Sequence, residues 1–222
     1  MVMTFFRKDE EGGLANISQQ VTTMLGDARH SFDLAMSAVV SGADPVAVGD
    51  EIRATDHRIN EAEQDIRRRL LVHASVQGTA NIELVLNYLL LSRKIERIGD
   101  QAKNILDLAD EGVNLVDGPD SDELSTYRDS ISSLFGAVSG VLAEPEGDTA
   151  EPTRSEGLAL ASDLEDRLLK LVHSDEPASY AVPRALLFRY LKRTAANLAG
   201  IISSVIDPFD QVDYPGGADT DD

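Results

Sequence analysis

The sequence RKIERIGDQAKNI, residues 93–105, belongs to the segment that decides the fold. Its apolar residues recur at spacings of three and four, which is the period of an α-helix with one buried face. The segment extends from Asn81 to about Ala109, and its first half is apolar on nearly all sides. We therefore expect a long helix over these residues that lies at the centre of the molecule.

The rest of the chain repeats this helical pattern. Aromatic residues make up only 5% of the sequence, Trp is absent, and the alternation typical of β-strands is scarce. Glycine and proline mark the breaks at 42–45, at 78, at 112–119 and at 144–152. The predicted helices between the breaks span Leu14–Ser41, Val46–His73, Asn81–Ala109, Asp122–Leu142, Thr153–His173 and Val182–Ile206.

The second half of the chain resembles the first. When the third helix is moved by 96 residues onto the sixth, five identical pairs result: Leu90 and Leu186, Leu91 and Leu187, Arg93 and Arg189, Arg97 and Arg193, Ile105 and Ile201. This match predicts an all-α fold of two tandem three-helix bundles, six helices in all, related by internal duplication. The expected organisation is an N-terminal arm (1–13), a first repeat (14–112), a diverged second repeat (120–207) and an acidic flexible tail (208–222).

The chain is strongly acidic. Its 39 acids and 20 bases give a formal net charge of −19, which disfavours nucleic-acid binding, because affinity for phosphate backbones comes from basic patches. Such a surface is typical of a salt-rich cytoplasm, although an ordinary acidic protein has the same composition. The sequence has no cysteine, no signal-peptide pattern and no apolar run long enough to span a membrane. We expect a cytoplasmic protein that does not insert into the membrane.

Acidic residues on the third helix are the first candidates for a site. Glu96 and Asp100 are four residues apart and are therefore neighbours on one helix face. Two adjacent carboxylates repel each other unless a positive group lies between them. A hard cation such as iron, manganese, magnesium or calcium would satisfy them. Alternatively, Lys103 and Arg97 neutralise them on a solvated face.

The second helix carries possible counterparts in Asp56, Asn60 and Glu63. Glu63 lies close to the apolar stripe of its helix, where an unpaired carboxylate would be costly. Its partner is either a base, from Arg67, Arg97 and Lys103, or a shared metal ion. No histidine stands in the Glu-x-x-His arrangement of di-iron bundles, and no phosphate-binding loop or nucleophile elbow is present. The sequence therefore contains no conventional active site.

The run Glu96-Arg-Ile-Gly-Asp100-x-Ala-x-Asn-Ile resembles the signature of the PhoU family of phosphate-uptake regulators. The upstream run Thr55-Asp-His-Arg-Ile-Asn60, followed by Glu63, is similar to the pattern on that family's second helix. The resemblance implies two related three-helix bundles whose acidic motifs bind iron or zinc clusters. It places Glu96, Asp100, Asp56 and Asn60 at the family's metal-binding positions, and we add Glu63 as a candidate ligand.

The resemblance also implies a partner and an assembly. Family members commonly form homodimers and act in the cytoplasm, beside a membrane phosphate transporter or its sensor histidine kinase. In the second repeat, however, Lys192 stands opposite Glu96 and Ala196 opposite Asp100. Because an ammonium and a methyl group cannot bind a cation, we expect at most one metal site, in the first repeat, for iron, zinc or manganese.

We therefore expect a non-enzymatic regulator of phosphate uptake or phosphate signalling that is modulated by a metal and located at the inner face of the membrane. Two alternatives remain at this stage. One is a metal-free helical adaptor held together by ion pairs. The other is an iron-dependent enzyme that uses the carboxylates of the bundle.

Overall fold

The computed structural model describes residues 14–78, 81–145, 147–209 and 212, and these residues form helices and connecting turns without any strand. The helices are α1 Leu14–Val40, α2 Pro45–Gln77, α3 Ile82–Asp110, α4 Ser121–Ala143, α5 Ala150–Val172 and α6 Ala178–Ile206. None of the helices in these ranges is both long and apolar enough to cross a membrane. The expected arm at 1–13 and nearly all of the expected tail lie outside the described residues.

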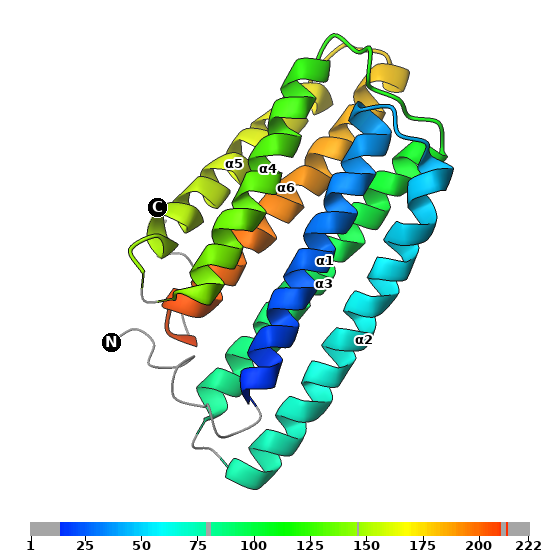
Figure 1. Ribbon diagram of the computed structural model, residues 1–222. Coiled ribbons are helices and arrows are strands. Elements are labelled where there is room, and N and C mark those ends of the chain that lie inside the picture. Colours follow the sequence, from blue (N-terminus) through cyan, green and yellow to red (C-terminus); the bar gives the residue numbers. More distant parts are fainter. Residues whose placement is uncertain (1–13, 79–80, 146, 210–211, 213–222) are drawn as a thin grey trace.

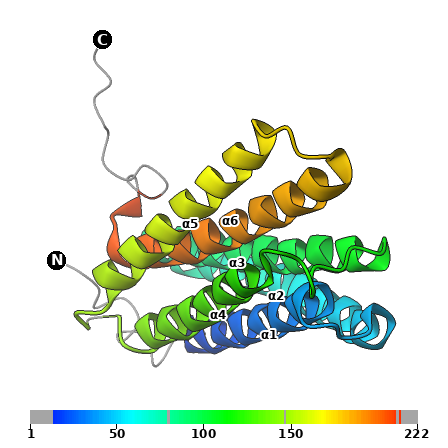
Figure 2. The same ribbon diagram turned by 90° about the horizontal axis from the view of Figure 1, so that it is seen from above.

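The helices form two three-helix units that lie side by side (Figure 1). In the first unit α3 packs against α1 and α2, and in the second unit α6 packs against α4 and α5. The two units meet through two pairs of helices: α3 packs on α6, and α1 contacts α4 (Figure 2). Phe32 of α1 and Phe135 of α4 join the units with ring centroids 5.7 Å apart. The predicted fold class and the central place of α3 are confirmed.

Glycine and a capping aspartate set the boundaries of α1 and α2. Gly42 (φ 76°) and Gly78 (φ 66°) adopt the left-handed backbone that ends a helix and that other residues rarely adopt. Asp44 then starts α2, since its carboxylate accepts a hydrogen bond of 3.0 Å from the Val46 N–H, with Pro45 in the first helical position. These turns were predicted from the sequence.

Two helices begin earlier than the sequence suggested. The loop expected at 144–152 ends at Thr149, because Pro152 lies in the first turn of α5, where backbone N–H groups have no helical acceptor to lose. The start expected at Val182 is wrong by a full turn. The Pro177 carbonyl accepts hydrogen bonds from the N–H groups of Tyr180 and Ala181, so that α6 begins at Ala178 and contains Pro183.

The linker between the units is tied to both of them. The Leu115 N–H donates a 2.9 Å hydrogen bond to the Val39 carbonyl at the end of α1. Arg184 of α6, which is buried, binds both carboxylate oxygens of Asp120 in the linker at 2.7 and 2.9 Å. The guanidinium of Arg184 also lies 3.9 Å from the centre of the Tyr180 ring. These contacts fix where α4 starts relative to α6.

Candidate metal centre

The candidate centre lies where α2 and α3 pack in opposite directions. A Cβ placed on Gly99 of α3 would lie only 3.3 Å from Cδ1 of Ile59, so the two helices approach closely here. Because the helices are antiparallel, residues one turn away on either side of this contact face each other. Asp56 therefore meets Lys103 on one side, and Glu63 and Glu96 lie across from each other on the other side.

On the first side of the Ile59–Gly99 contact, three candidate ligands gather around an ammonium group. Lys103 Nζ donates to Asp56 Oδ2 at 3.1 Å and lies 3.7 Å from Asp100 Oδ1. Asn60 Nδ2 donates to the same Asp56 oxygen at 3.2 Å. Burial disfavours the charged ammonium and lowers the pKa of Lys103. The hydrogen bond to Asp56 and the negative charge of Asp56 act more strongly in the opposite direction, so that the pKa of Lys103 is raised. A base of the chain thus neutralises Asp56 and Asp100.

On the other side of the contact, the buried carboxylate of Glu63 and the half-buried carboxylate of Glu96 lie near each other. The Glu63 side chain is 6% exposed and the Glu96 side chain 14%. Glu63 pairs with Arg67, and Glu96 lies 2.9 Å from Arg93 Nη1. Even so, Glu63 Oε1 and Glu96 Oε2 accept no well-directed hydrogen bond from any described residue. Burial, followed by the charges of Asp100 and Glu63, raises the pKa of Glu96.

The residues of the seam between α2 and α3 fit, in part, the metal that the resemblance implies. Buried carboxylate oxygens without hydrogen bonds are the ligands that hard cations prefer, so the Glu63–Glu96 pair fits a cation. Within the described part of the chain, no group of three or more His, Asp or Glu side chains converges as a full ligand set. Of the five candidates, Glu63 and Glu96 come together, whereas Asp56, Asn60 and Asp100 gather at Lys103.

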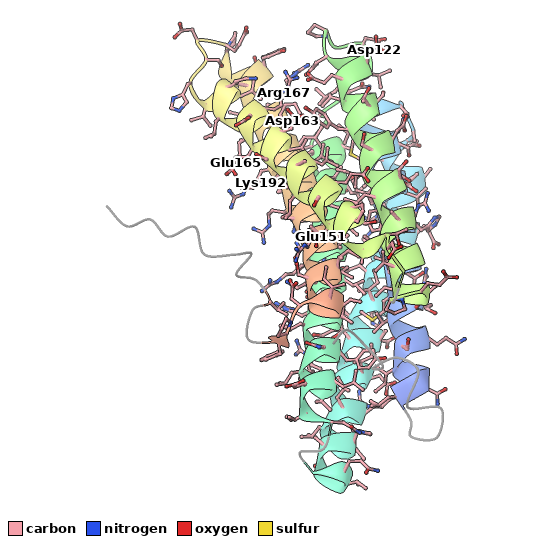
Figure 3. The ribbon with its side chains drawn as sticks, turned by 90° about the vertical axis from the view of Figure 1, so that its left-hand side faces the viewer. Asp122, Glu151, Asp163, Glu165, Arg167 and Lys192 are labelled. Atoms are coloured by element: carbon pink, nitrogen blue, oxygen red, sulfur yellow. The ribbon has the colours of Figure 1, made fainter. Side chains whose placement is uncertain are left out.

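The second unit has a base of its own at the matching place. Lys192 Nζ of α6 lies 2.5 Å from Glu165 Oε1 of α5, and both residues are labelled in Figure 3. Lys192 stands opposite Glu96 in the alignment of the repeats, so an ammonium replaces a carboxylate and neutralises an acid of the neighbouring helix. Ala196, opposite Asp100, adds only a methyl group.

Sequence reasoning missed a second polar cluster between α4 and α5. The Tyr127 hydroxyl hydrogen-bonds to Asp163, and Arg167 Nε donates to the same hydroxyl at 3.2 Å. Arg167 also pairs with Glu123 at 2.6 Å. Burial, with the hydrogen bond to Asp163, raises the pKa of Tyr127 to about 12. No sequence motif predicts this cluster. The Arg93–Glu96 pair, by contrast, could have been found from its spacing of three residues.

The fold and the seam between α2 and α3 define a class: an all-α protein of two fused three-helix units with acidic pairs between the second and third helices of the first. The family model described as the PhoU domain matches residues 21–109, which include the whole seam, and the chain therefore contains a PhoU domain. The resemblance to the PhoU family is confirmed. It supports a general role in regulating phosphate uptake.

Comparison with solved structures agrees with this assignment. PhoU from Pseudomonas aeruginosa superposes with a TM-score of 0.73 at 18% sequence identity, over 87% of this chain and 96% of that chain. At this identity the match shows a common fold that extends over both units. No curated protein sequence matches the chain significantly.

Proposed function

We propose that this protein is a non-enzymatic regulator of phosphate uptake, that it acts on a membrane phosphate transporter or on its sensor histidine kinase, and that a cation bound by Glu63 and Glu96 modulates it. The observation that carries the proposal is the Glu63–Glu96 pair within the range that matches the PhoU domain, with two buried oxygens that accept no directed hydrogen bond. Arg67 and Arg93 compensate the charges of these carboxylates, but an oxygen that accepts no directed hydrogen bond in a water-poor seam is costly and could be satisfied by a bound cation.

The cation would be divalent or ferric, with iron, zinc or manganese as the first choices. Glu63 and Glu96 would bind it, and Asp100 is the nearest further carboxylate on the same helix face. Asp56 and Asn60 would contribute from their position one turn away, beside Lys103. When bound, the cation supplies positive charge that holds α2 to α3. It therefore adds stability by mass action, in proportion to the logarithm of its concentration.

The site of action would be the inner face of the membrane. The helices in the described ranges do not span a membrane, so contact with a transporter or kinase would use exposed helix faces. A homodimer in the cytoplasm is the assembly that we propose from the PhoU resemblance. The dense negative charge argues against nucleic acid as a partner.

One specific observation favours a second candidate function, a metal-free helical adaptor. Each candidate carboxylate has a base within ion-pair distance: Arg67 for Glu63, Arg93 for Glu96, and Lys103 for Asp56 and Asp100. In that case the arginines would neutralise the pair and no ion would bind. The groove described below, between the start of α1 and the end of α2, is lined by none of the five candidate residues, so it gives the iron-dependent enzyme no support.

Elemental analysis distinguishes the first two candidates. The wild-type protein, a Glu63→Gln, Glu96→Gln double variant and a Glu165→Gln control would each be purified and then dialysed against iron, zinc or manganese. We expect about one ion per chain in the wild type and in the control, and none in the double variant. Equal and negligible metal in all three folded proteins would reject the cation and leave the adaptor.

Phosphate uptake tests the regulatory role separately. Deleting the gene in the source organism should raise the initial rate of uptake of radiolabelled phosphate, and the wild-type gene should restore the lower rate. The Glu63→Gln, Glu96→Gln gene should restore it only in part if the cation modulates regulation. An uptake rate unchanged by the deletion, under both scarce and abundant phosphate, would contradict the proposal.

A further inference from the structure

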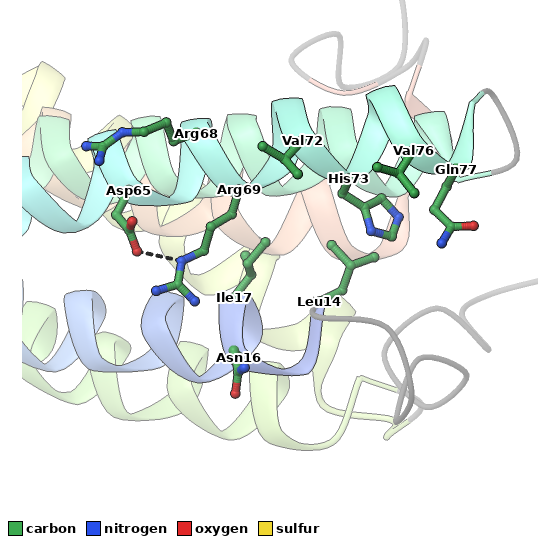
Figure 4. A pocket seen from close by; sticks show the side chains of 10 residues that line it. All are labelled: Leu14, Asn16, Ile17, Asp65, Arg68, Arg69, Val72, His73, Val76 and Gln77. Atoms are coloured by element: carbon green, nitrogen blue, oxygen red, sulfur yellow. Dashed lines mark hydrogen bonds and ion pairs between the residues drawn. The ribbon is translucent and has the colours of Figure 1, made fainter.

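An apolar groove lies between the start of α1 and the last turns of α2 (Figure 4). It has a volume of about 500 Å³. Its walls are formed by three residues of α1 and seven of α2: Leu14, Asn16 and Ile17 on α1, and Asp65, Arg68, Arg69, Val72, His73, Val76 and Gln77 on α2. None of the five candidate metal ligands lines the groove, and neither the proposed function nor the candidate metal centre accounts for it.

The α2 wall of the groove carries apolar side chains that are exposed to solvent. Val72 is 62% exposed and Val76 is 75% exposed, although they stand four residues apart on one helix face. On the α1 wall, Leu14 and Ile17 are almost completely buried. No described residue covers the two valines. Together with Leu14 and Ile17 they form an apolar surface that extends from the core to the solvent at this end of the bundle.

The rim of the groove is basic, on a protein whose net charge is −19. Arg69 Nε binds Asp65 Oδ2 at 2.6 Å, which neutralises one arginine (Figure 4). Arg68 is exposed and has no acidic partner among the described residues. The groove therefore suits an occupant that combines apolar side chains with negative charge.

The sequence directly before Leu14 combines apolar and charged side chains. Residues 1–6 read MVMTFF and supply five apolar side chains, and residues 7–11 read RKDEE, in which the three acids outnumber the two bases. Gly12 and Gly13 join this segment to Leu14, which itself lines the groove. An extended chain covers about 3.3 Å per residue, so the nine residues from Phe5 to Leu14 reach about 30 Å. The α2 wall from Asp65 to Gln77 is only about 18 Å long.

We propose that residues 1–11 of this chain are the occupant of the groove, with Phe5 or Phe6 against Val72 and Val76 and with the acids near Arg68. The segment would bury apolar surface that the helices leave open. A second copy of the chain is the rival occupant, because it could present the same segment in trans.

Disulfide trapping tests this docking, because the chain has no cysteine of its own. Phe5→Cys would be combined with Val76→Cys, and in a matched control with Ser75→Cys, and the same two pairs would be made with Phe6→Cys. Ser75 is exposed and next to Val76 in sequence, but it lies about 100° around the helix and does not line the groove. Each protein would be oxidised at low concentration and analysed by mass spectrometry and non-reducing electrophoresis.

We expect the pairs with position 76 to form a monomeric, intramolecular disulfide several-fold faster than the pairs with position 75. Covalent dimers formed selectively through position 76 would overturn the proposal in favour of a second copy. Equal rates of disulfide formation at positions 75 and 76 would show that the segment does not favour the groove face of α2, and would also overturn the proposal.

Hydrogen exchange provides a readout that needs no cysteine. In a Phe5→Ser, Phe6→Ser variant, the amides of residues 72–78 should exchange several-fold faster than in the wild type, and those of residues 45–60 should be unchanged. Unchanged exchange at 72–78 would count against docking. Metal content and phosphate uptake do not enter either experiment, so the result is independent of the proposed function.

Discussion

Lys103 Nζ of α3 lies 3.1 Å from Asp56 Oδ2 of α2, one turn beyond the contact between Ile59 and Gly99. On the other side of that contact Glu63 and Glu96 lie across the same seam, with arginines from their own helices but no base from the opposite helix. A lysine thus pairs with an acid across the two helices at one end of the seam, whereas at the other end each carboxylate pairs with an arginine of its own helix.

Replacing Lys103 with Gln should destabilise the protein, because Asp56 and Asp100 would lose the ammonium that pairs with them. Hydrogen bonds to charged groups contribute about 1.5–3 kcal/mol, and partial exposure of the lysine places the expected loss near the lower end. Urea unfolding measures the change. Lys170→Gln, at an exposed position on α5, should cost much less. If both variants lose the same stability, the lysine does not stabilise the seam.

Replacing Glu96 with Gln should have a pH-dependent effect. The pKa of Glu96 is raised above 4.5 by burial and neighbouring acids, so the folded state binds its proton more readily than the unfolded state. The cost of the charged carboxylate is fully present above the raised pKa and disappears as the pH falls toward 4.5. The Gln variant should therefore gain stability relative to the wild type at pH 7, and the gain should shrink in acid.

Urea titrations of both proteins between pH 4.5 and pH 8, without added metal, would measure this difference. The same replacement at the exposed Glu156 controls for the loss of one charge. A gain that stays constant across the whole range would contradict the role of burial. Because metal binding requires the deprotonated carboxylate, added metal should oppose the gain of the Gln variant.

Much of the fold could be predicted from the sequence, because helical periodicity and glycine breaks are local signals. The capping pair Asp44 and Pro45 is one example, and Gly78 is another. The early starts of α5 and α6 could not be predicted, because proline usually marks a helix boundary, whereas Pro152 lies in the first turn of α5 and Pro183 lies inside α6. Local signals thus predict which segments are helical better than where each helix starts.

The candidate site was less accessible to sequence reasoning. Spacing placed Glu96 next to Asp100 on one helix, but which residue of α2 each of them meets depends on the register between two helices. That register follows from Ile59 packing on Gly99, a contact that no local pattern encodes. For this reason Glu63 opposite Glu96, and Asp56 opposite Lys103, became apparent only in three dimensions.

Removing Arg184 should destabilise the fold strongly. Its guanidinium is 7% exposed and binds both oxygens of Asp120, which is itself 14% exposed. An Arg184→Met variant would leave a buried aspartate unpaired, at a cost of about 3–5 kcal/mol. The control is Arg53→Met, which breaks an exposed pair with Asp50 and should cost at most about 1 kcal/mol. Urea unfolding midpoints would reveal the difference, and similar losses in the two variants would refute a special role for the linker contact.

Two glycines should respond in opposite directions to replacement by alanine. A Cβ on Gly157 of α5 would lie 3.0 Å from Cβ of Ala199 and 3.3 Å from Leu134, so Gly157→Ala should cost about 1–3 kcal/mol through crowding. A Cβ on Gly140 of α4 meets no atom within 4 Å, so Gly140→Ala should gain about 0.5–1 kcal/mol. Thermal melts would test the pair. A gain at both positions would mean that α5 does not pack as closely on α6 as described.

Replacing Tyr127 with Phe should remove the hydroxyl that lies between Asp163 and Arg167 and cost about 0.5–1.5 kcal/mol, since Asp163 is exposed and can bond to water in its place. The pH dependence adds a second signature. Because the pKa of Tyr127 is raised from 10 to about 12, the folded state keeps the phenolic proton that the unfolded state loses, and wild-type stability falls as the pH rises through this range. The Phe variant lacks this component, so its deficit should shrink between pH 10 and pH 12. Urea unfolding at pH 9 and pH 11 measures the change, with Tyr190→Phe as the control. A deficit that is independent of pH would show that the hydroxyl contributes by packing alone.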